Sequence, residues 1–358
     1  MNEDESGLTG CFTGKKALVV GGSGGIGAQL ARLLARSGAT LTVHGGSHSP
    51  RFDALLDDLT AISADFARAD SSAPSSKLVH GDDGVIMSAS ASATGDGTAA
   101  QTTVALGAND ACVLSEVMHH AISCEAHLAV TPCLKSRALP VCGDVTMPAA
   151  RTAAAISAPS PATVTALVQR ITVENFATLA DTPLARAVAE SEVLCICYGP
   201  FLQKSLDVMT VQDWQDMAVL NYALPGFLVS AALGGMMERH WGRILLFGGT
   251  GTASRSEFRT NVAYAGAKTA VGTLVQSTAA AYARFGITCN AVLPGFTQTE
   301  YTGAQTEALA QQMPLGTLIT AEAVARAAFF LLRSPDINGA LLRLDRGWSP
   351  AFCDFPYQ

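Results

Sequence analysis

Near its N-terminus the chain contains Ala17-Leu18-Val19-Val20-Gly21-Gly22-Ser23-Gly24-Gly25-Ile26-Gly27. A short apolar run that ends at glycine is typical of a buried parallel strand. The residues from Gly27 to Ser37 have a helical spacing of apolar side chains, and Gly38 stands where a helix C-cap belongs. Leu41-Thr42-Val43 follows as a second strand, so this part of the chain forms a βαβ unit.

The glycine-rich turn of this unit predicts a dinucleotide-binding site. Glycine lets the backbone approach a ligand closely, and the N-terminus of the following helix offers unpaired N–H groups to a diphosphate. The position of the turn after the first strand of a βαβ unit favours this interpretation over a glycine turn without a ligand. The residues expected to contact the cofactor here are Gly21, Ser23, Gly24, Gly25, Ile26 and Gly27.

The end of the second strand is where such a fold reads the adenosine ribose, and a carboxylate there selects NAD. Here that end falls at about Gly45, and no carboxylate follows it before Asp53. The vacant position leaves room for a 2′-phosphate, with Ser47, His48 or Arg51 nearby. The sequence therefore favours NADP(H) over NAD(H), with Gly45 and Ser47 among the cofactor contacts.

Strand and helix patterns alternate again in the second half of the chain. Strands are predicted at 193–197, 243–247, 288–292 and 340–344, and helices at 52–62, 211–233 with a kink at Pro225, 263–284 and 321–333. Strands separated by helices predict an α/β fold, a doubly wound parallel sheet of the Rossmann type. The third strand of that sheet stays open, because 141–145 and 168–172 both fit it.

The stretch 64–162 has a different texture from the rest of the chain. It is rich in Ala, Ser, Thr and Gly and shows no clear alternation of strands and helices. We interpret it as a partly low-complexity insertion in a single main domain, which consists of 8–63 and 163–350. Residues 351–358 are expected to form a C-terminal tail.

Tyr264 and Lys268 lie four residues apart at the start of a predicted helix and therefore share one face. A phenol has a pKa near 10, and a fixed ammonium nearby lowers that pKa. Such a pair can give a proton to a carbonyl oxygen as hydride reaches the carbon, and can take it back in reverse. Chance produces this spacing in about one chain in ten of this composition, so the pair needs support from other motifs.

In order and spacing, these motifs resemble the short-chain dehydrogenase/reductase family. The glycine loop is similar to the family's Thr-Gly-x-x-x-Gly-Ile-Gly, with Val20 in place of Thr, and Tyr264 and Lys268 match its Tyr-x-x-x-Lys. Further segments that resemble the family are Trp214 with Asn221, Asn290–Thr299, Pro314–Gly316 and Asn338–Trp348. The resemblance covers about residues 13–62 and 185–350.

The resemblance implies an oxidoreductase that moves a hydride between NADP(H) and a carbonyl or secondary alcohol. The 3-oxoacyl-acyl-carrier-protein reductases are the most similar members, so acyl thioesters are candidate substrates and a homodimer or homotetramer is expected. Tyr264 would act as general acid/base, Lys268 would lower its pKa and hold the nicotinamide ribose, and Asn221 would hold a water that relays protons. The further cofactor contacts implied are Gly199, Tyr264, Lys268, Pro294, Gly295 and Thr299.

The chain departs from the family at two places. Gly249 aligns with the family's serine, and Thr250, one residue on, is our prediction for the catalytic hydroxyl; Thr252 or a site without a hydroxyl are the alternatives. The family's Asn-Asn-Ala-Gly becomes Ile196-Cys197-Tyr198-Gly199. These departures and the insertion motivate a rival hypothesis, a non-catalytic nicotinamide-nucleotide-binding protein that acts as sensor or scaffold.

The insertion also contains a group of potential metal ligands. His120, Cys124 and His127 would share one face of a helix, which is compatible with zinc. A surface helix that happens to carry histidines is the more economical interpretation, and Cys195 and Cys197 are interpreted as buried structural thiols. We therefore predict no metal site.

Composition narrows the class of protein. Apolar residues make up 49% of the 358 residues and charged residues 15%, so the chain can bury a sizeable core. The formal net charge is −7 and no basic tract occurs, which argues against a nucleic-acid partner. Scattered cysteines, an acidic start without a signal sequence and no long apolar run predict a cytoplasmic protein without a membrane span.

Overall fold

A computed structural model describes most of the chain outside the predicted insertion. The described residues are 10–72, 78–80, 86–88, 163–253, 257–258, 260–300 and 302–348. They belong to two compact units, one formed by Met1–Ala73 with Ser157–Gln358 and the other by Pro74–Ile156. In the second unit the structure describes only an antiparallel pair, β3 (Leu78–His80) and β4 (Ile86–Ser88). All predicted site residues lie in the first unit.

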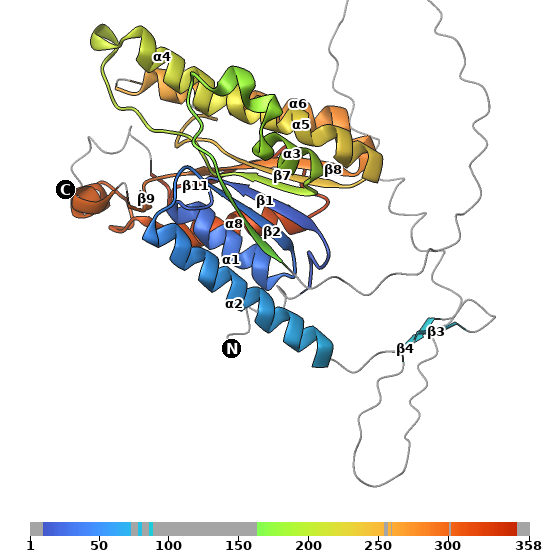
Figure 1. The fold of residues 1–358 in the computed structure, drawn as a ribbon. Coiled ribbons are helices and arrows are strands. Elements are labelled where there is room, and N and C mark those ends of the chain that lie inside the picture. Colours follow the sequence, from blue (N-terminus) through green and yellow to red (C-terminus); the bar gives the residue numbers. More distant parts are fainter. Residues whose placement is uncertain are drawn as a thin grey trace, which may run out of the picture. The chain divides into compact units, whose positions relative to one another are not determined.

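The first unit is built on a seven-stranded sheet in which every neighbouring pair is parallel. Its order is β11-β8-β7-β6-β1-β2-β5, and Figure 1 shows it between two layers of helices. The strands are β1 (Lys16–Val20), β2 (Thr40–Gly45), β5 (Val164–Val168), β6 (Val193–Ile196), β7 (Gly242–Phe247), β8 (Ile287–Pro294) and β11 (Leu341–Leu344). The chain winds outward in both directions from β1 and β6, which confirms the predicted doubly wound α/β fold. Ligands bind such sheets at the carboxyl ends of the strands where the order reverses.

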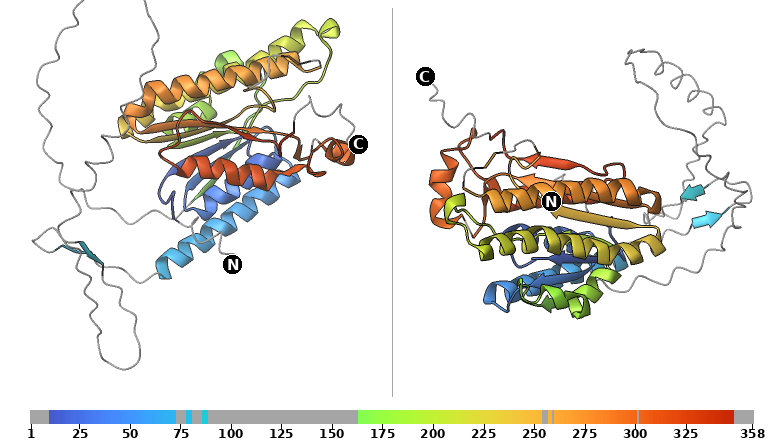
Figure 2. Two further views of the ribbon diagram at one scale, coloured as in Figure 1. Left: turned by 180° about the vertical axis from the view of Figure 1, so that it is seen from behind. Right: turned by 90° about the horizontal axis from the view of Figure 1, so that it is seen from above.

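Helices cover both faces of the sheet, as the views in Figure 2 also show. One layer contains α1 (Gly25–Arg36), α2 (Pro50–Ser72) and α8 (Ala321–Arg333), and the other contains α3 (Pro183–Glu190), α4 (Val211–Ala218), α5 (Leu224–Arg239) and α6 (Val262–Tyr282). Each layer buries its own apolar core against the sheet. Leu34 and Phe329 belong to the first core, and Leu228 and Val275 to the second.

The predicted helix 211–233 is interrupted by a π-helical turn, η5 (Val219–Ala223), between α4 and α5. Pro225 stands in the first turn of α5 and has no N–H to donate, so the ladder of hydrogen bonds changes register just before it. Single π-helical turns inside α-helices occur frequently at functional sites. Here the turn carries the predicted site residue Asn221.

The combined segment Val211–Arg239 is long and apolar enough to cross a membrane by length and composition. Half of its apolar window is nevertheless buried inside the fold. A helix that packs in a protein core meets the same criteria, so this one is weak evidence for a membrane span.

The third strand of the sheet corrects the sequence prediction. β5 pairs with β2 from Leu41↔Val164 to Gly45↔Val168, so the candidate 168–172 lay four residues too far along the chain. The other candidate, 141–145, lies outside the described residues. β5 forms the edge of the sheet and three of its five residues, Thr165, Ala166 and Val168, are exposed. Because of that exposure it lacks the continuous apolar run by which the central strands are recognised.

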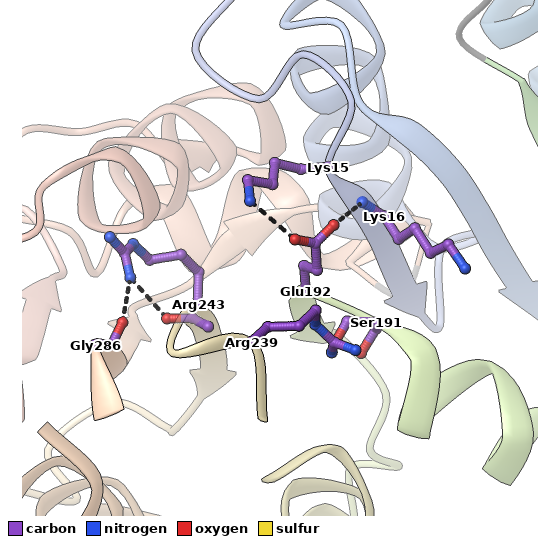
Figure 3. Close-up of polar contacts among 8 residues, drawn as sticks. Lys15, Lys16, Ser191, Glu192, Arg239, Arg243 and Gly286 are labelled. Atoms are coloured by element: carbon purple, nitrogen blue, oxygen red, sulfur yellow. Dashed lines mark hydrogen bonds and ion pairs between the residues drawn. The ribbon is translucent and has the colours of Figure 1, made fainter. Parts of the chain in front are cut away.

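Polar contacts fix the amino ends of the central strands (Figure 3). The Glu192 carboxylate accepts from Lys15 Nζ at 2.9 Å and from the Lys16 N–H at 3.0 Å, which ties the start of β6 to the start of β1. Arg239 donates to the Ser191 carbonyl at 2.8 Å, and Arg243 donates to the Gly286 carbonyl at 2.9 Å. These contacts hold β1, β6, β7 and β8 in register.

The core beneath α8 generates a stability prediction. Phe329 is 2% exposed, and its ring lies edge-on to Phe12 at 5.6 Å between centroids, whereas its neighbour Phe330 is 49% exposed. We expect Phe329→Ala to lower the free energy of unfolding by about 3–5 kcal/mol, because it leaves a cavity in the core. The matched control Phe330→Ala should lower it by less than about 1 kcal/mol. Urea unfolding checks both, and equal losses would contradict this placement of α8.

Candidate active site

The glycine loop connects β1 to α1 in a turn that only glycine allows at two positions. Gly21 has φ +77°, and a Cβ added at Gly27 would overlap the Gly21 carbonyl oxygen. Helix α1 starts after Gly24 with no side-chain hydrogen bond at its N-cap among the described residues. Its first N–H groups therefore point toward the carboxyl end of the sheet, where they and the helix dipole suit an anionic group.

A buried histidine, which the sequence analysis did not single out, fixes this loop to the sheet. His44 near the end of β2 is 1% exposed, its Nδ1 accepts from the Gly21 N–H at 3.3 Å, and its Nε2 lies 2.8 Å from the Gln169 carbonyl. Since Nδ1 must accept, the proton belongs on Nε2. Burial lowers the pKa of His44 and keeps it neutral, as both bonds require.

A cavity of about 350 Å³ opens beside the first turn of α1. Its lining includes Ser23, Gly25, Gln29, Arg51, Thr299 and Glu300. Three of the predicted cofactor contacts, Ser23, Gly25 and Thr299, thus meet in one place although they come from opposite ends of the sequence. Gly45 is instead buried beneath the ring of Phe52, and Ser47 is exposed just beyond β2.

Tyr264 and Lys268 lie in the first turns of α6, where the sequence places them. Lys268 is 6% exposed, donates from Nζ to the Phe247 carbonyl at 3.0 Å and lies 5.8 Å from the centroid of the Tyr264 ring. Burial lowers the pKa of Lys268 to about 8 and raises the pKa of Tyr264 to about 12. The expected lowering of the Tyr264 pKa is absent in this arrangement, because the ammonium is directed at a carbonyl and burial dominates.

The side-chain amide of Asn221 lies close to Lys268, beside Gly199. Its Nδ2 donates to the Pro200 carbonyl at 3.0 Å, while its buried Oδ1 has no hydrogen-bond partner in the described part of the chain. A Cβ added at Gly199 would overlap Asn221 Oδ1 and would lie 3.0 Å from Lys268 Nζ. Glycine at 199 therefore leaves room between an ammonium and an unpaired carbonyl oxygen, a setting that suits a bound water.

The threonines near the missing serine have their hydroxyls engaged. A Cβ added at Gly249 would lie 3.4 Å from Tyr264 Cε1, so position 249 faces the phenol ring. Thr250 Oγ1 donates to the Pro294 carbonyl at 2.7 Å, and the buried Thr252 Oγ1 donates to the Gly249 carbonyl at 2.8 Å. Of the two, Thr250 is the less buried hydroxyl.

An aromatic residue beside Tyr264 escaped the sequence analysis. The ring of Phe201 stands edge-on to the Tyr264 ring, 5.0 Å between centroids, and the Phe201 side chain is 61% exposed. Its segment is anchored by the ion pair of Lys204 with Asp213, 2.6 Å, and by the bond of Gln203 to Thr260. An aromatic two residues after the strand-end glycine was the only signal in the sequence.

The segment after β8 folds over the glycine loop. Pro294 ends β8, and the N–H of Gly295 donates to the Leu344 carbonyl at 2.8 Å. A short parallel pair, β9 (Thr297–Gln298) with β10 (Ile319–Thr320), then directs the chain toward α1. A Cβ added at Gly25 would lie 3.2 Å from Thr299 Cγ2. Of the predicted residues of this segment, Thr299 lines the cavity, whereas Pro294 and Gly295 lie before it, at the end of β8.

Of the cysteines considered at the sequence level, Cys195 and Cys197 are free thiols within β6 and directly after it. Burial raises the pKa of Cys197 to about 12 and that of Cys195 well above its ordinary value, so both stay protonated at neutral pH. The histidines considered as metal ligands, His120 and His127, lie outside the described residues.

Comparisons with known proteins agree with this arrangement. A family model described as Enoyl-(Acyl carrier protein) reductase matches residues 144–349, more than half of the chain. The 3-oxoacyl-[acyl-carrier-protein] reductase of Pseudomonas aeruginosa is 37% identical over 127 residues, 34% of this chain and 51% of the relative. The D-beta-hydroxybutyrate dehydrogenase of Cupriavidus necator is 28% identical over 155 residues, 38% of this chain and 59% of the relative. The chain thus spans about half to three fifths of the length of these curated relatives.

Solved structures show the same fold. A 3-oxoacyl (acyl-carrier-protein) reductase from Agrobacterium tumefaciens C58 with NADP bound has a TM-score of 0.61 at 18% identity, over 97% of this chain and 98% of that chain. A short-chain dehydrogenase/reductase from Serratia marcescens has a TM-score of 0.58 at 19% identity, over 94% of this chain and 98% of that chain. At such identities the likeness establishes the fold alone.

The buried ammonium generates a prediction about pH. The pKa of Lys268 is about 8 in the folded protein and 10.5 ordinarily. At pH values between these two, Lys268 is protonated in the unfolded chain but not in the folded protein, so the free energy of unfolding rises with pH. Below about 8 both states are protonated and this contribution is flat. Lys268→Met removes the titrating group. Between pH 7 and pH 10 the free energy of unfolding of wild type should therefore rise by roughly 1–3 kcal/mol relative to that of the variant. Urea unfolding at several pH values checks this, and parallel profiles would contradict it.

Proposed function

Because this chain belongs to the short-chain dehydrogenase/reductase family, an oxidoreductase family, we propose that it transfers a hydride between NADP(H) and a carbonyl or secondary alcohol. The observation that carries the proposal is that Lys268 Nζ and Asn221 Oδ1 meet at Gly199, while the same Lys268 Nζ lies 5.8 Å from the centroid of the Tyr264 ring. The N-terminus of α1, where Gly24 provides no side-chain cap, fits a dinucleotide, and Asn221 Oδ1, unpaired among the described residues, fits a water. A bound nicotinamide would supply or accept the hydride.

In the direction of reduction Tyr264 is the acid. Its raised pKa of about 12 keeps the phenol protonated at neutral pH, so it can give its proton to a substrate oxygen that gains negative charge. Lys268, with a pKa of about 8, is mostly protonated at neutral pH and can stabilise the phenolate that remains. A water held between Lys268 Nζ and Asn221 Oδ1 would return a proton toward this pair.

The substrate proposal is a ketone with an apolar group, with 3-oxoacyl thioesters first among the candidates. Phe201 offers an exposed aromatic surface next to Tyr264, and Gly249, which also lies beside the Tyr264 ring, carries no side chain. The P. aeruginosa relative is named for reduction of 3-oxoacyl-acyl-carrier-protein, which supports this class of substrate.

The preference for NADP(H) over NAD(H) is part of the same proposal. No carboxylate stands at the end of β2, and Arg51 in the first turn of α2 lines the cavity. A cation near the adenosine ribose suits a 2′-phosphate. The structural neighbour from A. tumefaciens is described with NADP bound.

Location and assembly follow as proposals. The sequence features given above favour the cytoplasm, where reduced nicotinamide cofactors and free thiols coexist. Large apolar side chains are exposed along α4 and η5, among them Val211, Trp214 and Tyr222, which suits a homodimer or homotetramer.

Removal of the phenol hydroxyl tests the proposed acid. Tyr264→Phe should lower kcat for NADPH-dependent reduction of a 3-oxoacyl thioester by about 10²–10⁴-fold, because the proton donor is lost while the ring stays in place. Tyr282→Phe, near the end of the same helix, is the matched control and should leave kcat unchanged. If wild type binds NADPH but reduces no ketone or thioester in a broad panel, the rival sensor or scaffold is supported instead.

A set of hydroxyl variants tests the partner of Tyr264. We propose that Thr250, the less buried hydroxyl, leaves the Pro294 carbonyl to bond the substrate oxygen. Thr250→Val should then lower kcat by roughly 10–100-fold with unchanged NADPH affinity, whereas Thr250→Ser should retain activity. Gly249→Ser places a hydroxyl beside Tyr264 and should restore kcat in the Thr250→Val background. An unchanged kcat in Thr250→Val would refute the role of Thr250.

A further inference from the structure

An ion pair crosses the cavity at the glycine loop. Arg51 Nη1 lies 3.2 Å from Glu300 Oε1, and Arg51 Nη2 donates to Glu300 Oε2, also at 3.2 Å. Arg51 comes from the start of α2, and Glu300 follows β9, 249 residues later in the sequence. Both side chains line the cavity. The two-pronged contact thus joins two segments that line the proposed cofactor site.

The Glu300 carboxylate also lies against the start of α1. A Cβ added at Gly25 would be 3.1 Å from Glu300 Oε2, and one added at Gly24 would be 3.7 Å from Glu300 Oε1. Gly24 is the N-cap of α1, so the carboxylate stands over the positive end of the helix dipole. A helix N-terminus at a glycine loop is where a nucleotide phosphate binds. Two anions at this place repel each other.

We propose that Glu300 competes with the cofactor phosphates for Arg51 and for the N-terminus of α1, and thereby weakens cofactor binding. This inference rests on the proposed cofactor site. When a nicotinamide nucleotide binds, Arg51 exchanges the Glu300 carboxylate for a phosphate of the cofactor. The Arg51 and Glu300 side chains are 52% and 31% exposed, and exposed ion pairs are weak, so the exchange is feasible.

As a consequence, Glu300 lowers the affinity for the cofactor although it does not itself bind it. Glu300 pairs with Arg51 before the cofactor binds and gives up this contact afterwards. Retaining Glu300 loosens the complex and favours release of the oxidised cofactor after turnover. Arg51 is held at the cavity by Glu300 until the cofactor arrives, so it is already positioned for a phosphate.

The test is direct titration of wild type, Glu300→Gln, Arg51→Gln and the double variant with NADPH and with NADH, followed by fluorescence. Glu300→Gln should lower the Kd for NADPH by roughly tenfold, because the carboxylate no longer repels the cofactor phosphate. Solvent screens this repulsion at a partly exposed site, so we expect no larger effect. Arg51→Gln should raise that Kd. In the double variant the effect of Glu300→Gln should shrink, since Arg51 is one of the two groups for which the anions compete.

The NADPH and NADH arms identify the phosphate involved. A gain for NADPH alone assigns the competition to the 2′-phosphate, and an equal gain for both assigns it to the diphosphate; either supports the proposal. Glu190→Gln, which removes a carboxylate of an exposed ion pair with Lys16, is the charge-matched control and should leave both Kd values unchanged. Thermal unfolding confirms that each variant is folded.

Unchanged or weaker NADPH binding by folded Glu300→Gln would overturn the inference, even if wild type binds NADPH and the proposed function stands. Failure of wild type and of the Glu190→Gln control to bind either nucleotide would instead overturn the proposed function, and the inference with it.

Discussion

The close approach of the glycine loop to the first turn of α1 is the constraint on which the site depends. Gly27 and Gly21 lie so near each other that a side chain at Gly27 has no room, and the loop is tied to β2 through neutral His44. The turn directs α1 so that its N-terminus, where Gly24 provides no side-chain cap, faces the carboxyl end of the sheet. Because β1 and β6 are the neighbouring strands from which the chain winds outward in both directions, the loop lies where such sheets bind ligands, at the carboxyl ends of the strands.

Burial then decides the protonation of the two groups that we propose to be catalytic. Lys268 is buried and Tyr264 is partly buried, with the ring of Phe201 against it, and their pKa values move in opposite directions to about 8 and about 12. An ammonium that loses its proton more easily and a phenol that keeps its proton form an acid poised for reduction. The π turn before Pro225 places Asn221 at the same point, with a carbonyl oxygen left for a water.

Most of the fold could be predicted from the sequence because its central strands are continuous apolar runs and its helices have clear periodicity. The exposed edge strand Val164–Val168 could not, since it lacks that signal and follows an Ala- and Ser-rich stretch. Tyr264, Lys268 and Asn221 could be proposed as site residues from their spacing and from the family likeness. Contacts that depend on tertiary packing were missed: the ring of Phe201 on Tyr264, the bonds of His44, and the pair of Arg51 with Glu300.

The central claim is that the glycine loop and Tyr264 serve one reaction, a hydride transfer from cofactor to carbonyl carbon. The most direct measurement uses NADPH with both C4 hydrogens replaced by deuterium, a 3-oxoacyl thioester, and mass spectrometry of the product. The account predicts one deuterium on the new carbinol carbon and, since the hydroxyl proton comes through Tyr264 and water, none retained on oxygen. A reduced product without deuterium at that carbon, or no product from protein that binds NADPH, would contradict it.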